Sequence, residues 1–121
     1  MCIKMKINKN KIIRTNKVFG GSLYNPSNLD FEIEMANKQK NVYRGLAYIT
    51  RAMTSGHSFS DGNKRTALVV VKSELADRGI NVNQKKLAKS MVRLADKNES
   101  RINIIERRIR RSRRWTMKFM K

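Results

Sequence analysis

The sequence is 121 residues long, with 40% hydrophobic residues and a formal net charge of +19. This length and composition predict one folded domain with a modest core, and no stretch of the sequence approaches the run of about 20 apolar residues that spans a membrane. The single cysteine, Cys2, excludes an internal disulfide and a cysteine-based metal cluster. We expect a cytoplasmic protein without a signal peptide and without a membrane partner.

The positive charge is concentrated at the two ends of the chain. Residues 1–17 contain six lysines and arginines and no acid, and residues 101–121 contain nine against the single Glu106. We therefore divide the chain into a basic N-terminal segment (1–17), a central domain (18–111) and a basic C-terminal tail (112–121). Such ends are typical of solvated, solubilising tails and also of weak nucleic-acid binding through phosphate contacts, and both interpretations stay open.

The first 40 residues contain the turn signals. Residues 1–17 are compatible with a strand, a short helix or a frayed arm. Residues 18–28 hold paired glycines and the only proline, and predict a turn or a small β-hairpin. A helix is expected to begin near Leu29, with Ser27 or Asn28 as its N-terminal cap.

Two helices are expected in the middle of the chain. Residues 41–53 carry one apolar stripe at helical spacing, made of Val42, Leu46, Ile49 and Met53. A second helix is expected to begin near Asn63, and the dense apolar run 67–71 predicts that it is buried on most sides at the centre of the fold. The run 69–71 also suits a strand, although its flanking residues favour a helix.

Two further helices complete the expected fold. Gly79 is expected to end the buried helix in a left-handed conformation. Asn83 and Ser100 are the expected caps of the last two helices. Their apolar faces consist of Leu87, Met91 and Leu94, and of Ile102, Ile105 and Ile109. The predicted architecture is all-α, a helical bundle around a central buried helix with one small β-hairpin.

The loop between the two middle helices holds groups suited to acid–base and metal chemistry. His57 is the only histidine in the chain and can take a proton near neutral pH. Asp61 is a hard oxygen ligand of the kind that Mg²⁺ accepts beside phosphate oxygens. Phe59 is expected to point into the core and support the loop.

The residues after Asp61 are suited to phosphate. Gly62 and Asn63 begin a helix whose first N–H groups lack partners inside the helix, and such an end attracts anions. Lys64 and Arg65 add positive charge, and an arginine can hold two phosphate oxygens at once. Each of these residues taken alone is also compatible with a structural role, so the combination within nine residues carries the prediction.

Residues 57–65 resemble the Fic/Doc (Fido) signature, H-x-F-x-(D/E)-(G/A)-N-(G/K)-R. A looser resemblance extends from about Gly20 to Arg111, and it includes a glycine-containing flap before the motif. The resemblance implies a Fido-type helical bundle over 18–111. It also implies a transferase that uses Mg-ATP to modify a Ser, Thr or Tyr hydroxyl of a target protein.

The resemblance also implies roles for individual residues. His57 would be the general base and Asp61 the Mg²⁺ ligand. The N–H groups of Gly62, Asn63 and Lys64 would hold the nucleotide phosphates, and the Arg65 side chain would stabilise the charge of the transferring group. The flap that aligns the target would consist of Gly21, Ser22, Leu23 and Tyr24.

Two residues point to one branch of the family. Members that transfer AMP usually have Gly at the position of Lys64 and a second Arg at the position of Leu68. Both departures resemble the Doc (death-on-curing) toxin branch, whose members transfer the terminal phosphate instead. The proline of many Fic signatures is replaced by Ser58. Doc-like phosphotransfer is therefore favoured, with AMP transfer (AMPylation) as the alternative.

Regulation and non-enzymatic functions give further hypotheses. No Glu in the chain is followed by Gly or Asn, so the inhibitory (S/T)-x-x-x-E-(G/N) helix of the family is missing, and we expect an antitoxin-like inhibitor protein. The segment 107–115, where Trp115 follows several arginines, is compatible with a basic nucleic-acid-binding module. A Fido domain without turnover is the third possibility.

Overall fold

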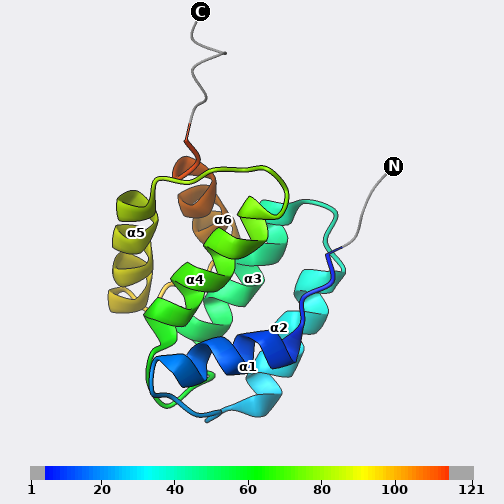
Figure 1. Ribbon diagram of the computed structural model, residues 1–121, viewed down its shortest axis with the longest axis vertical. Coiled ribbons are helices and arrows are strands. Elements are labelled where there is room, and N and C mark those ends of the chain that lie inside the picture. Colours follow the sequence, from blue (N-terminus) through cyan, green and yellow to red (C-terminus); the bar gives the residue numbers. More distant parts are fainter. Residues whose placement is uncertain (1–4, 115–121) are drawn as a thin grey trace, which may run out of the picture.

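The computed structural model describes residues 5–114, and their regular structure is helical (Figure 1). The helices are α1 (Lys9–Val18), α2 (Pro26–Asn37), α3 (Val42–Thr54), α4 (Asn63–Ala76), α5 (Gln84–Asp96) and α6 (Ile102–Arg111). Within residues 5–114, extended pairing is limited to two isolated bridges, Leu23 with Phe59 and Val82 with Arg113. The predicted all-α class is confirmed. No helix of the described part is long and apolar enough to cross a bilayer.

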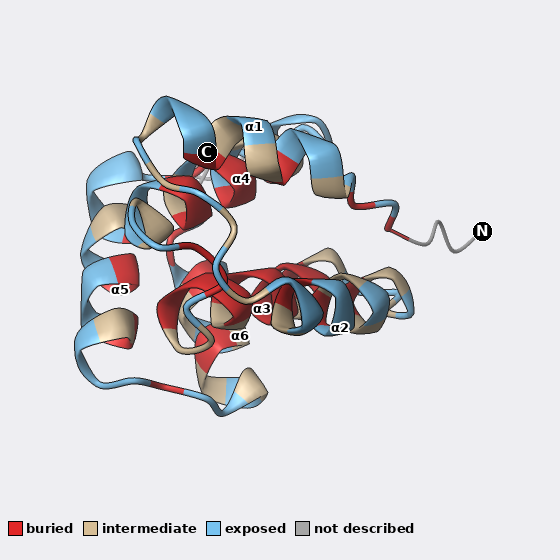
Figure 2. Cartoon of the chain, turned by 90° about the horizontal axis from the view of Figure 1, so that it is seen from below, coloured by how far each residue is buried: buried red, intermediate tan, exposed pale blue. Residues whose placement is uncertain are grey.

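Helix α3 is the centre of the bundle. It buries ten of its 13 residues and packs against α2, α4, α5 and α6. Figure 2 shows it as the most continuously buried helix. The sequence predicts instead that the helix beginning near Asn63 lies at the centre and is buried on most sides, and this part of the prediction is wrong. Helix α4 is covered by α1, α3 and α5 but leaves a solvent-facing side, where Val69 is 40% exposed.

Helix α1 joins the N-terminal segment to the same core. Asn8 caps this helix, because its side chain accepts a hydrogen bond from the N–H of Lys11, the third helical residue. Ile12 and Asn16 are buried on its inner face, which packs against α4. The described part of the basic segment 1–17 is thus not a separate arm, because a helix with a buried face belongs to the domain that covers it. The two other buried residues of this segment are Met5 and Ile7.

The segment 18–28 does not form the expected β-hairpin. Helix α1 ends at Val18 and α2 begins at Pro26, and no bridge forms within the connection between them. It pairs with the loop after α3 through the Leu23–Phe59 bridge. The cap of α2 is Asn25, not Ser27 or Asn28, and Pro26 occupies the first helical position, where its missing N–H has no cost.

The second half of the chain follows the predicted pattern more closely. Asn83 caps α5 by accepting a hydrogen bond from the N–H of Lys86 at 3.1 Å, and Gly79 has the expected left-handed φ of +75°. The cap of α6 is Arg101 rather than Ser100, and it makes no side-chain capping bond. The predicted apolar residues that are fully or almost fully buried are Leu87, Met91, Leu94, Ile105 and Ile109.

The beginning of the basic tail is attached to the domain. The N–H of Asn83 donates to the carbonyl of Ser112 at 2.7 Å, and the N–H of Arg114 donates to the carbonyl of Asn81 at 2.8 Å. These bonds place residues 112–114 beside the loop between α4 and α5. Trp115, which the sequence connects with nucleic-acid binding, lies outside the described residues, as does Cys2.

An ion pair between the half-buried Arg51 and the buried Glu32 lies near the C-terminal end of α3. The guanidinium of Arg51 donates to both carboxylate oxygens of Glu32 on α2, at 2.7 and 2.9 Å. It also donates to the carbonyl of Ser100, at 3.2 Å. The hydrogen-bonded Glu32 raises the pKa of Arg51 above its ordinary value. This pair connects α2, α3 and the loop before α6, directly before the segment that carries His57.

Candidate active site

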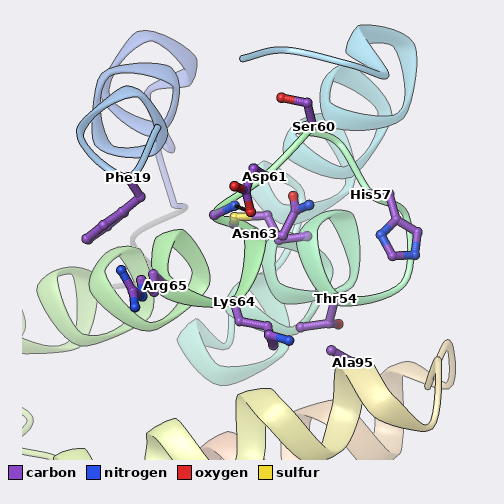
Figure 3. A pocket seen from close by; sticks show the side chains of 11 residues that line it. Phe19, Thr54, His57, Ser60, Asp61, Asn63, Lys64, Arg65 and Ala95 are labelled. Carbon is purple, nitrogen blue, oxygen red and sulfur yellow. Dashed lines mark hydrogen bonds between the residues drawn. The ribbon is translucent and has the colours of Figure 1, made fainter. Parts of the chain in front are cut away.

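A cavity of about 420 Å³ lies between the end of α3 and the beginning of α4 (Figure 3). His57 and Arg65 lie at opposite sides of it, with Asp61 and Asn63 between them. Every residue for which a catalytic, metal or phosphate role is predicted lines this cavity. The full lining is Phe19, Met53, Thr54, His57, Ser60, Asp61, Gly62, Asn63, Lys64, Arg65 and Ala95.

The backbone of His57 is held in a left-handed conformation, with a φ of +49° that is uncommon for a residue with a side chain. The next residue, Ser58, is fully buried. Its N–H and its Oγ both donate to the carbonyl of Ala52, at 3.0 and 2.9 Å. Its Oγ also accepts a hydrogen bond from Asn28 Nδ2 at 3.1 Å. These bonds fix the loop while the imidazole stays exposed at the rim of the cavity.

Phe59 and Asn63 brace the loop against the start of α4. Phe59 is 1% exposed, as the sequence predicts for a supporting residue. The N–H of Phe59 donates to Asn63 Oδ1 at 3.2 Å, and Asn63 Nδ2 donates to the carbonyl of Phe59 at 2.8 Å. The Asn63 side chain is therefore committed to the loop, which leaves its backbone N–H as the group able to meet a ligand.

The N-terminus of α4 forms an anion site from its backbone. Gly62 has a φ of +71°, and a Cβ there would come within 2.9 Å of the Phe19 Cβ, so both conformation and space require glycine. Among the described residues, the N–H groups of Asn63, Lys64 and Arg65 have no hydrogen-bond acceptor. Unpaired N–H groups at a helix start favour phosphate.

One predicted phosphate ligand is already engaged. The N–H of Gly62 donates to Oδ1 of Asp61 at 2.7 Å. In this arrangement Gly62 orients the Asp61 carboxylate and is not available to a phosphate oxygen. The remaining carboxylate oxygen, Oδ2, makes no hydrogen bond within residues 5–114 and is the atom best placed to meet a cation.

The donor set fits Mg²⁺ bound together with phosphate. The described residues contain no cluster of three or more His, Cys, Asp or Glu side chains able to hold a metal. A single carboxylate, that of Asp61, is enough when nucleotide phosphates supply other ligands, which is the usual way proteins bind Mg²⁺. Lys64 and Arg65 are exposed at the same cavity, and neither forms an ion pair within the described part of the chain.

Helix α1 and the residue directly after it supply two site residues that were not predicted from the sequence. Phe19 lines the cavity. The fully buried Asn16 donates from Nδ2 to the carbonyl of Asp61 at 2.7 Å and to Thr66 Oγ1 at 3.1 Å. The available signal was a polar amide four residues after Ile12, on the apolar face of a helix, where an amide needs a partner.

The predicted flap runs beside the motif loop rather than into the cavity. The N–H of Tyr24 donates to the carbonyl of Ser58, and the N–H of Ser60 donates to the carbonyl of Ser22, both at 2.8 Å. This pattern leaves the N–H and C=O of Leu23 pointing away from the loop. The side chain of Tyr24 is 72% exposed, and Gly21 has no space for a Cβ, which would lie 2.2 Å from the Asp61 carbonyl.

Comparison with known proteins identifies the matched region. The model of the Fic/DOC family matches residues 4–75, which is more than half of the chain. The match includes α1 and nearly all of α4, and therefore all cavity residues except Ala95. No curated protein and no solved structure matches the chain significantly.

Proposed function

The chain belongs to the Fic/DOC family, and on this premise we propose that it transfers a phosphate-containing group from Mg-ATP to a Ser, Thr or Tyr hydroxyl of a target protein. The observation that carries the proposal is the convergence of His57, Asp61 and the start of α4 on one cavity. A cavity of about 420 Å³ is within the usual size range for small-molecule sites.

His57 acts as the general base in this proposal. Its imidazole is exposed at the cavity rim, where it can reach the hydroxyl of a segment bound outside the protein. The hydroxyl oxygen attacks phosphorus while its proton passes to His57. The fixed backbone at Ser58 supports this role, because proton transfer requires the base to be held in position.

The beginning of α4 holds the phosphates. The phosphate oxygens accept hydrogen bonds from the N–H groups of Asn63 and Lys64 and from the guanidinium of Arg65. Positive charge near the transferring group lowers the activation barrier of the transfer. Asp61 would hold Mg²⁺, which neutralises phosphate charge when bound. The protein contributes positioning and electrostatics, as expected for phosphoryl transfer.

Transfer of the terminal phosphate is favoured over transfer of AMP. The Lys64 side chain lines the cavity and adds charge where AMP-transferring relatives have Gly. Leu68 packs against the hydrophobic core and does not line the cavity, so the second arginine of those relatives has no counterpart there. In phosphotransfer the bond from the γ phosphorus to the β–γ bridging oxygen breaks and ADP leaves. In AMP transfer, the alternative, attack is at the α phosphorus and pyrophosphate leaves.

The target segment is proposed to pair with the outer edge of the flap. The outward N–H and C=O of Leu23 can bind an extended peptide by strand addition, with the exposed Tyr24 beside it.

Because the chain lacks the inhibitory motif, we also propose restraint by a separate antitoxin-like protein, which makes the enzyme a toxin when unrestrained. If expression of the protein slows cell growth and His57→Ala relieves the effect, the result would support the toxin role.

ATP labelled differently on its α and γ phosphates tests the function. The protein, its His57→Ala variant and a Lys85→Ala control, altered on the exposed side of α5, are each incubated with Mg²⁺ and cell lysate. Transfer of the γ label alone, lost in His57→Ala and kept in Lys85→Ala, supports the phosphotransferase. Transfer of the α label shows an AMP transferase instead. Transfer of neither label contradicts the enzyme proposal.

A further inference from the structure

A second hollow, of about 890 Å³, lies between α5 and α6 on a part of the surface separate from His57. Its lining is dominated by cations, with Asp96 as the one acid. We call this hollow the cationic groove. Its cations are Lys86, Lys89, Arg93, Lys97, Arg108 and Arg111.

The cations form two facing rows. Four of them follow α5 at positions i, i+3, i+7 and i+11, beginning at Lys86 and ending at Lys97, and this spacing places them along one side of the helix. At 1.5 Å per residue the row is about 16 Å long. Arg108 and Arg111, three residues apart on α6, face it across the groove. Much of α5 is exposed in Figure 2.

The charge of the groove is not compensated within the protein. In residues 5–114 none of its six cations forms an ion pair, whereas five other arginines do. Those paired arginines are Arg44, Arg51, Arg78, Arg101 and Arg110. Most acids of the chain form ion pairs elsewhere, and Asp96 is the one acid in the groove, so the groove keeps an excess of positive charge for a partner.

We propose that the cationic groove binds the phosphate backbone of a double-stranded nucleic acid. A row of about 16 Å is as long as about five base-pair steps of a duplex, since each strand carries one phosphate per 3.4 Å of helix axis. The groove lining contains no aromatic side chain, whereas single-strand binders use aromatic stacking. Ala88 and Val92 are the only apolar residues of its lining, so it lacks the large apolar anchors that dominate protein–protein interfaces.

This site differs from a loose basic tail and does not depend on the proposed transferase activity. Its residues lie on two packed helices, while the tail 112–121 begins beyond them. Ala95 of α5 lines the His57 cavity and its neighbour Asp96 lines the groove. A nucleic acid in the groove would therefore hold the cavity close to proteins bound to the same duplex.

Fluorescence anisotropy with a labelled 20-base-pair DNA duplex, at several NaCl concentrations, tests the proposal. Contact with six phosphates predicts a slope of log K against log salt of about −5. The variant Lys89→Glu/Arg93→Glu should bind at least about tenfold more weakly, with a slope smaller in magnitude by about 2. His57→Ala should bind as the unaltered protein does.

A matched charge change supplies the control. Lys6→Glu/Lys40→Glu alters the net charge equally at another hollow, which also contains Glu74 and Asp77, and should change affinity less than about threefold. If both double variants weaken DNA binding equally, the proposed role of the cationic groove is wrong. Full loss of DNA binding in Lys118→Gln/Lys121→Gln would also contradict it. Tighter binding of the single strand or of polyglutamate than of the duplex would overturn the proposed partner. Circular dichroism verifies that each variant is folded.

Discussion

Asn16 of α1 donates a 2.7 Å hydrogen bond to the backbone carbonyl of Asp61, and so ties the N-terminal helix to the loop that carries the proposed metal ligand. The same amide donates to Thr66 on α4. Asn16 is fully buried, and its Oδ1 has no hydrogen-bond partner within the described residues. The side-chain amide thus donates to the loop and to α4 while its oxygen stays without a partner. We infer that Asn16 holds the loop in position.

Replacing Asn16 by Ala should reduce both stability and turnover. The carbonyl of Asp61 and the hydroxyl of Thr66 lose a buried donor, which costs about 1–3 kcal/mol of unfolding free energy. If Asn16 positions Asp61, kcat falls more than KM rises, because the loss is felt in the transition state. Urea unfolding and steady-state kinetics measure the two effects.

The control for Asn16 lies on the same helix. Thr15 donates only to the carbonyl of Lys11 within α1, so Thr15→Ala should change stability by less than about 0.5 kcal/mol and leave kcat unchanged. Equal kcat in Asn16→Ala and Thr15→Ala would remove Asn16 from the site.

Ser58→Pro, which introduces the proline of many Fic signatures, should destabilise this chain. Proline has no N–H for the carbonyl of Ala52 and no Oγ for Asn28, so two buried hydrogen bonds to Ala52 and one from Asn28 are lost. We expect a loss of about 2–3 kcal/mol in unfolding free energy, and about 1 kcal/mol for Ser58→Ala, which keeps the N–H. Thermal unfolding of both variants checks the order, and a Ser58→Pro variant as stable as the parent would contradict it.

The Glu99 carboxylate should contribute to acid sensitivity. The Arg101 side chain, hydrogen-bonded to both of its oxygens, lowers the pKa of Glu99 from 4.5 to about 2. A lowered folded-state pKa gives a stabilisation that is complete above pH 4.5 and is lost as the pH falls through about 2. Urea midpoints between pH 5 and about 2 should therefore decline less steeply for Glu99→Gln than for the parent. Parallel curves would show that the pair does not couple to folding.

Lys64 and Leu68 should determine which phosphorus is attacked. Lys64→Gly removes a cation from the cavity, and Leu68→Arg adds the second arginine found in AMP-transferring relatives. The double variant should transfer more α label relative to γ label than the parent does. Leu68→Met, which keeps the apolar contact with the core, is the control and should leave the ratio unchanged. An unchanged ratio in the double variant would show that other residues choose the transferred group.

Much of the local structure could be read from the sequence. The stripe at 42–53 and the cap residue Asn83 predict α3 and α5 correctly, because helical periodicity and capping depend on residues only a few positions apart. The motif at 57–65 likewise predicts which residues share a cavity, since the end of a short loop and the first turn of the helix that follows it lie close together.

Other features depended on contacts between distant segments. The density of apolar residues indicates α4 as the central helix, yet α3 is more buried because four helices pack around it. The paired glycines predict a hairpin, but the connection between α1 and α2 instead pairs with the loop at Phe59. Neither outcome follows from local pattern, because burial and extended pairing are decided by which segments the whole chain brings together.

From the sequence alone, five of the six helices of the described residues could be predicted, together with the side-chain chemistry of residues 57–65. The tertiary structure alone decided that the basic N-terminal segment belongs to the site. Asn16 and Asp61 are 45 positions apart, and their contact forms only when α1 packs on α4. A hydrogen bond across that separation depends on the packing of the whole core, and no pattern within either segment contains it.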